Sequence, residues 1–146
     1  MGIMKINSHQ LQFSLYDPKS LHHKTIRYLY RLSLRDGTIR DDLRGVLNSK
    51  YEGYVIICKL NTKIIGWSLI YRSNKNHRFN VSVYVQNGYR FNGIGRNLVL
   101  KSKQFAHEKK RNIKCNGWDI NSCNFFSSVG LKKINKKSWY DHHYWH

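Results

Sequence analysis

The chain of 146 residues has the size of one domain, so we expect a single domain over residues 1–146. Its 40% of hydrophobic residues, its single proline and its ten glycines exclude a disordered or collagen-like class. With 26 Lys and Arg against 8 Asp and Glu, the formal net charge is +18, which favours anionic partners.

The N-terminal part predicts one strand followed by two helices. Alternating apolar and polar residues predict a strand over residues 6–15. Asp17 and Pro18 then supply an N-cap and a first-turn proline, which predict a helix that runs to about residue 34. Thr38 starts a capping-box pattern, which predicts a shorter second helix.

The central part predicts three antiparallel strands. Residues 54–60 and 63–71 are rich in β-branched and aromatic side chains, and only Asn61 and Thr62 separate them. This spacing is typical of a hairpin with a tight connection. Residues 78–85 predict the third strand, after a polar turn.

The C-terminal part alternates helices and strands. Apolar residues at helical spacing predict a helix over residues 96–110, and a short helix is expected to end at Gly130. The remaining elements are a strand at 113–118, that short helix at 121–129, and a final strand pair at 131–134 and 138–146.

The most informative segment is the junction between the third strand and the next helix, residues 85–96, VQNGYRFNGIGR. Gly93 and Gly95 allow backbone amides to approach an anion closely, and the start of a helix adds about half a positive charge. Arg90 and Arg96 add full positive charges. The segment therefore predicts a phosphate-binding loop.

The pattern of this loop excludes two common nucleotide sites. Leu98 stands where a dinucleotide fingerprint needs a third glycine, and the Gly-Lys-Ser/Thr of the triphosphatase loop is missing. Arg90, Gly93 and Gly95 instead resemble the Arg/Gln-x-x-Gly-x-Gly/Ala signature of the Gcn5-related N-acetyltransferases (GNAT). The preceding strand also resembles that family's Val-x-Pro-x-x-Arg, with Asn87 in place of the proline.

Two further segments resemble the same family, so the resemblance covers nearly the whole chain. Residues 64–67, IIGW, are similar to its third strand, and residues 125–131, FFSSVGL, to its Phe-Tyr-x-x-x-Gly-Phe ending. The resemblance implies an α+β fold with a mostly antiparallel sheet of six or seven strands flanked by about four helices. The expected order is β-α-α-β-β-β-α-β-α-β-β.

The resemblance also implies a co-substrate, acetyl-coenzyme A, and the residues that bind it. The main chain of one strand would hold the acetyl and pantetheine part, and the amides of the loop would hold the pyrophosphate. Arg90 would contact phosphate or close the loop. The family's pantetheine-contacting asparagine falls at Asp119 by strict counting from Gly130, but the nearby Asn121 is the preferred candidate. The strand residues are Val83, Tyr84 and Val85; the loop residues are Phe91, Asn92, Gly93, Ile94, Gly95 and Arg96.

The chain departs from the family at the position of its general acid. Many members carry a tyrosine four residues before the final glycine, where this chain has Phe126, which has no proton to donate. A thiolate with a pKa of about 8.5 leaves readily enough for transfer to continue, but more slowly. Tyr140 in the last strand pair is the first candidate for a replacement acid, with an ordinary strand aromatic as the alternative.

A general base is not identified by any motif. The candidates for deprotonating an acceptor amine are Glu52, His77 and His142. Strand alternation places Asp141 and His143 on the face opposite His142, so we expect no metal site there.

The leading hypothesis is an N-acetyltransferase that moves an acetyl group directly from acetyl-coenzyme A to an amine. The charge, with basic clusters at 109–111 and 132–137, suggests an acceptor on RNA or DNA, such as an aminoacyl-tRNA or a modified base, or a lysine of a nucleic-acid-associated protein. One alternative is an inactive or weakly active binding or inhibitory protein of this fold. Another is a basic nucleic-acid-binding module.

No apolar run in the chain reaches the ~20 residues of a membrane span, and the N-terminus lacks the pattern of a secretory signal. We therefore expect a cytoplasmic protein with no membrane partner.

Overall fold

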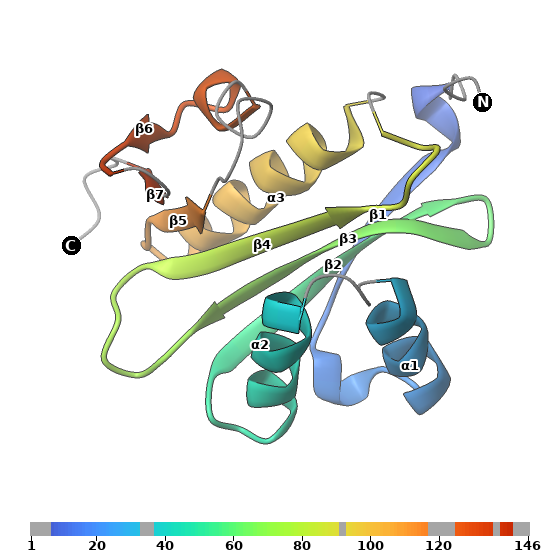
Figure 1. Ribbon diagram of the computed structural model, residues 1–146, viewed down its shortest axis with the longest axis horizontal. Helices are drawn as coiled ribbons and strands as arrows, with labels where there is room; N and C mark the ends of the chain where they lie inside the picture. The colour runs from blue at the N-terminus through green and yellow to red at the C-terminus, as the bar shows by residue number, and fades with distance from the viewer. Residues whose placement is uncertain (1–6, 33–36, 91–92, 117–124, 136–137, 142–146) are drawn as a thin grey trace.

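The computed structural model describes residues 7–32, 37–90, 93–116, 125–135 and 138–141 (Figure 1). Its strands are β1 (Leu11–Tyr16), β2 (Glu52–Leu60), β3 (Lys63–Arg72), β4 (Phe79–Val85), β5 (Ile113–Asn116), β6 (Lys132–Lys133) and β7 (Ser138–Tyr140). Its α-helices are α1 (His23–Leu32), α2 (Gly37–Leu47) and α3 (Ile94–Glu108), with a further helical segment at 125–128. Two 3-10 turns, η1 (Ser8–Gln10) and η2 (Pro18–Ser20), flank β1.

The described strands form one seven-stranded sheet in the order β1-β2-β3-β4-β5-β7-β6. Among them, only β4 and β5 are parallel, because α3 carries the chain back across the sheet between them. All other neighbours are antiparallel. The expected α+β fold, with a mostly antiparallel sheet of seven strands and flanking helices, is confirmed.

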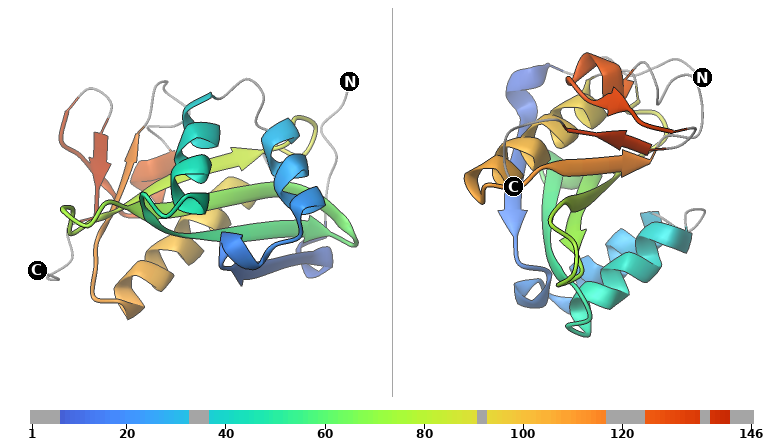
Figure 2. Two further views of the ribbon diagram at one scale, coloured as in Figure 1. Left: turned by 90° about the horizontal axis from the view of Figure 1, so that it is seen from below. Right: turned by 90° about the vertical axis from the view of Figure 1, so that its left-hand side faces the viewer.

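Helices cover the two faces of the sheet in separate layers. Figure 2 shows α1 and α2 on one side of the sheet and α3 on the other. Side chains of successive residues in β2 point alternately to the two faces of the sheet. Val55 and Ile57 pack with α1 and α2, while Ile56 and Cys58 pack with α3. The sheet is thus apolar on both faces where helices cover it.

Three predicted boundaries in the N-terminal part were wrong. The first strand begins at Leu11 rather than at residue 6, because Ser8–Gln10 form the 3-10 turn η1. Asp17 does cap the next element, since its Oδ1 accepts a hydrogen bond from the Lys19 amide at 3.0 Å. That element is only the 3-10 turn η2, because Leu21 is extended (φ −75°, ψ 143°) and separates it from α1. Likewise α2 begins at Gly37, so the predicted cap, Thr38, already lies inside its first turn.

Gly53 shows how closely α2 packs on the sheet. A Cβ added at Gly53 would lie 2.3 Å and 2.8 Å from the two γ-carbons of Val46, which is itself buried. We expect Gly53→Ala to lower the free energy of unfolding by about 1–3 kcal/mol, measured by urea denaturation. Val46→Ala should recover part of this loss when combined with it. Strictly additive effects of the two substitutions would contradict this packing.

None of the described helices is long and apolar enough to cross a membrane.

Candidate functional site

The parallel strands β4 and β5 pair over only part of their length. Phe79 is opposite Ile113, and Val81 is opposite Cys115, which is the last pair in the register. β4 continues to Val85, and β5 to Asn116, without further pairing between these described residues. The end of β4 therefore has no strand neighbour on its β5 side within the part of the chain that the structure describes.

Main-chain groups of β4 are directed into this opening. The Gln86 amide donates to the Ile65 carbonyl of β3 at 2.8 Å. Because main-chain direction alternates along a strand, Tyr84 also faces β3, whereas Val83 and Val85 direct their amides and carbonyls away from it. Val83 and Val85, two of the three strand residues expected to hold acetyl-coenzyme A, thus direct main-chain polar groups toward the open side. The main-chain amide and carbonyl of Tyr84 face β3 within the sheet.

The loop after β4 is held by local hydrogen bonds. The Tyr89 amide donates to the Gln86 carbonyl at 3.1 Å, and Arg90 Nε donates to the Val85 carbonyl at 3.1 Å. Gly88 adopts a left-handed conformation with φ +94°. The contact made by Arg90 joins the loop back to the end of β4, the second of the two roles expected for this residue.

The N-terminus of α3 follows this loop, and its N-cap residue offers no side chain to the first amides of the helix. Gly93 is the N-cap residue in the left-handed region (φ 74°, ψ 8°), which favours glycine, and it makes no side-chain cap. The first turn contains no acidic residue, and Ile94 is buried beneath it. The helix dipole and the free amides are therefore available to an anion.

The two glycines of the loop have different surroundings. A Cβ at Gly93 would meet none of the described residues beyond its chain neighbours and its own helix within 4 Å, so its surroundings in that part of the chain are open. A Cβ at Gly95 would lie 3.6 Å from both Phe125 Cζ and Val85 Cγ2. These are ordinary contact distances, so α3 packs against β4 and the 125–128 helix at Gly95, while the open side of Gly93 gives access to the amides. We call the first turn of α3 from Gly93 to Arg96 the cradle; its positive helix end suits an anion.

Several residues predicted for the site lie outside the described residues. They are Phe91, Asn92, Asn121 and His142. Arg96, by contrast, is described and is exposed on the first turn of α3.

Residues 17–131 of the chain match the acetyltransferase (GNAT) family. The chain belongs to this family. The resemblance seen in the glycine-containing loop is thereby confirmed over most of the chain. A comparison with curated proteins finds no match.

Solved structures of GNAT proteins share the fold at low sequence identity. An acetyltransferase from Bacillus subtilis in complex with CoA is 14% identical with a TM-score of 0.68, covering 89% of this chain and 97% of that one. The spermidine N-acetyltransferase of Vibrio cholerae, in complex with CoA and spermine, is 14% identical with a TM-score of 0.67, covering 92% and 96%. Escherichia coli ElaA is 12% identical with a TM-score of 0.66, covering 89% and 97%.

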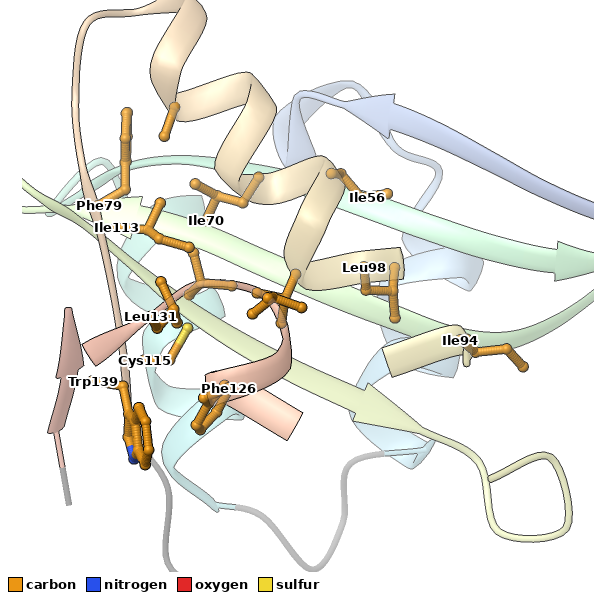
Figure 3. Packing of buried hydrophobic residues seen from close by; sticks show 14 of the residues in the cluster. Ile56, Ile70, Phe79, Ile94, Leu98, Ile113, Cys115, Phe126, Leu131 and Trp139 are labelled. Carbon is orange, nitrogen blue, oxygen red and sulfur yellow. The ribbon is translucent and has the colours of Figure 1, made fainter. Parts of the chain in front are cut away.

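Phe126, which the resemblance in the sequence aligns with the tyrosine of many GNAT proteins, is buried. Its ring centroid lies 5.0 Å from that of Phe125 and 6.0 Å from that of Trp139. Figure 3 shows Phe126 and Trp139 close to Cys115 and Leu131, which belong to the same core cluster. The side chain fills the site with apolar contacts and supplies no hydroxyl.

Tyr140 lies on the face of the sheet opposite Phe126. Its neighbour in β7, Trp139, packs into the α3 core, so strand alternation directs the Tyr140 side chain to the α1/α2 side. Tyr140 is opposite Lys114 in β5 and Lys132 in β6. It is therefore one row before the end of β4–β5 pairing and on the face that α3 does not cover.

Glu52 is not brought to this region. It is the first residue of β2, and its Oε2 accepts from Arg72 Nε at 2.8 Å in an ion pair. Arg72 ends β3 beside the start of β4, whereas the loop follows the end of β4, roughly 20 Å further along the strand at ~3.3 Å per residue. The geometry separates this carboxylate from the cradle.

Sequence reasoning missed a hydrogen-bonded pair between the sheet and α2. The Tyr71 hydroxyl donates to Asp42 Oδ2 at 2.7 Å. Burial, reinforced by this bond and by the Asp42 charge, raises the pKa of Tyr71 far above its usual value. Tyr71 is therefore a hydrogen-bond donor rather than a base. Only the fold brings the two residues together, since 29 positions separate them in sequence.

The raised pKa of Tyr71 predicts how stability depends on pH. The neutral phenol favours the folded state fully below the unfolded pKa of about 10, and this contribution is lost as pH rises above it. We expect Tyr71→Phe to show a smaller decrease in the free energy of unfolding between about pH 9 and 11 than the unmodified protein. Urea denaturation at several pH values measures this. Parallel decreases in both proteins would refute it.

Proposed function

We propose that this chain is an N-acetyltransferase that uses acetyl-coenzyme A as its donor and acts as a single domain. The observation that carries the proposal is the N-terminus of α3 at Gly93, beside the edge of β4 where Val83 directs its amide and carbonyl, and Val85 its amide, toward the opening. The Val85 carbonyl is bonded to Arg90 Nε. The structures with CoA from Bacillus subtilis and Vibrio cholerae support it, since they share this fold.

Different residues of the loop and of β4 would bind different parts of acetyl-coenzyme A. The amides of Gly93, Ile94, Gly95 and Arg96 hold the pyrophosphate, and Phe91 and Asn92 extend the same loop. The main chain of Val83 and Val85 holds the pantetheine arm and the acetyl carbonyl by strand-like hydrogen bonds, and Asn121 contacts the arm from the β5 side. Acetyl-coenzyme A would supply the acetyl thioester that an amine attacks.

Acetyl transfer needs a general acid for the thiolate and a general base for the amine. Tyr140 is on the face that α3 does not cover, one row before the end of β4–β5 pairing. We therefore propose it as the general acid that donates a proton to the departing thiolate. His142 is two residues further along the chain and is proposed as a base. Glu52 forms an ion pair with Arg72 at the other end of the sheet, so we propose no role for it in proton transfer.

The acceptor is proposed to be an amine carried by an anionic molecule. The net charge of +18 attracts RNA or DNA and repels polycations such as spermine. An amine on a nucleic acid, such as an aminoacyl-tRNA or a modified base, or a lysine of a protein bound to nucleic acid, would arrive with compensating negative charge. Because Phe126 has no hydroxyl that could act as a general acid, a second candidate function is a protein that binds acetyl-coenzyme A but transfers the acetyl group slowly or not at all.

The test is a calorimetric titration of the purified protein with acetyl-coenzyme A, followed by measurement of thiol release with amine acceptors. We expect binding with a Kd on the order of 10⁻⁶ M and acceptor-dependent release. Binding without release for any amine would favour the second candidate. Absence of binding would refute the donor assignment itself.

A further inference from the structure

A group of cationic side chains surrounds Tyr140 on one face of the sheet. Asn80, Lys114, Tyr140 and Lys132 lie side by side on adjacent strands, so their side chains emerge on the same face. Arg78 places its guanidinium carbon 4.7 Å from the centroid of the Tyr140 ring. We call Arg78, Lys114, Lys132 and Tyr140 the Tyr140 cluster.

The cations of this cluster are held close together without a carboxylate. Lys114 Nζ lies 5.7 Å from the Tyr140 ring centroid, so the same ring attracts two positive groups. None of the ion pairs formed among the described residues involves Arg78, Lys114 or Lys132. A site with several cations and no internal counter-charge attracts an external anion.

The nearest carboxylates on the described part of the chain are engaged elsewhere. Asp141 follows Tyr140 directly, but it is buried on the other face, where it bonds His107. Asp42 reaches the same face of the sheet from α2, and there it accepts the Tyr71 hydroxyl. Neither of these carboxylates, within the described part of the chain, therefore offsets the positive charge of the Tyr140 cluster.

The cluster borders the place where an acceptor would meet the donor. Its row on β4 is Asn80, and Ser82 lies on the same face one step closer to the open end, roughly 7 Å along the strand. The α3 face of the opening is covered by the core that contains Phe126. On the opposite face Ser82 and the Tyr140 cluster border the opening, so an acceptor would approach the donor from this side.

We infer that the Tyr140 cluster is an acceptor subsite that binds a phosphate group of the amine substrate. Arg78 offers the planar donors that suit phosphate, Lys114 and Lys132 add point charges, and Tyr140 adds a hydroxyl and a ring face. The inference rests on the proposed acetyltransferase function and names its substrate class: a phosphate-bearing amine. The phosphate belongs either to a small molecule or to the backbone of RNA.

The test measures acceptor binding with the donor site already filled by CoA. Phosphoethanolamine and ethanolamine are titrated by calorimetry, and a fluorescein-labelled, unstructured RNA of six nucleotides by anisotropy. The test variant is Arg78→Gln/Lys114→Gln. The matched control is Lys101→Gln/Lys109→Gln, which removes the same charge from two lysines that also lie over aromatic rings, Phe13 and Tyr54, on the α3 side.

We expect the test variant to weaken at least one phosphate ligand about 10-fold or more, while the control variant changes it less than about 3-fold. Loss with phosphoethanolamine identifies a small acceptor, and loss with RNA alone identifies a backbone phosphate. Equal weakening in both variants, or no preference of the unmodified protein for phosphate ligands, would overturn the subsite. CoA affinity, measured separately in each variant, reports failure of the donor site instead.

Discussion

Gly93→Glu should weaken the binding of acetyl-coenzyme A by at least about 100-fold. Gly93 sits at φ +74°, where any side chain adds strain, and its open side leads to the free amides of α3. A carboxylate there would occupy the cradle, neutralise the positive end of the helix and repel the pyrophosphate of the ligand. Calorimetric titration of both proteins measures the difference.

Gly93→Gln is the matched control for this substitution. It imposes the same backbone strain and nearly the same volume, but it carries no charge, so we expect it to retain at least about 10-fold more affinity than Gly93→Glu. Thermal unfolding of both variants establishes that α3 remains folded. If the two variants bind acetyl-coenzyme A equally well, electrostatic repulsion has no part in the effect and the anion cradle is misplaced.

Phe126→Tyr should raise kcat for acetyl transfer by about 10- to 100-fold. The substitution adds a hydroxyl at the position where many GNAT proteins hold a tyrosine, without altering the ring that packs against Phe125 and Trp139. A general acid there would protonate the departing thiolate from the α3 face of the sheet, whereas the unmodified protein is proposed to rely on Tyr140 on the other face. The gain should be in kcat, with little change in the affinity for acetyl-coenzyme A.

Phe126→Leu separates the hydroxyl from the packing. It keeps an apolar side chain but loses the aromatic contacts, so kcat should stay the same or decrease, and the free energy of unfolding should fall by about 1–2 kcal/mol. An increase in kcat with leucine would mean that loosening the core, rather than adding an acid, speeds the reaction. An unchanged kcat with tyrosine would place the thiolate away from this position.

The sequence by itself was sufficient for the family and for the outline of the fold. Local signals carried this information: alternation in the strands, the Asn61-Thr62 connection, and the two glycines before α3. These signals act over a few residues, and Asn61 indeed takes a positive φ of 55° in the tight turn. The Arg90, Gly93, Gly95 pattern identified the family because a phosphate cradle needs those residue types at that spacing.

The local signals were weaker at the boundaries of the first helix. Asp17 does form the predicted N-cap, but the same cap occurs at the start of 3-10 turns as well as α-helices. The length of the capped element depends on Leu21, which packs in an extended conformation against the core formed by α1, α2 and the sheet. Tertiary packing therefore decided where the α-helix starts.

Only the tertiary structure decided which side chains share a face near the opening. Tyr140 was a candidate to replace the acid missing at Phe126, yet β7 pairing puts the two residues on opposite faces of the sheet. Glu52 was a candidate base and is paired with Arg72, and Tyr71 and Asp42 meet across the α2 interface. These relations depend on strand register, and a shift of one residue would turn each side chain to the other face. Such contacts join positions far apart in the chain, and no local pattern of residue types specifies them.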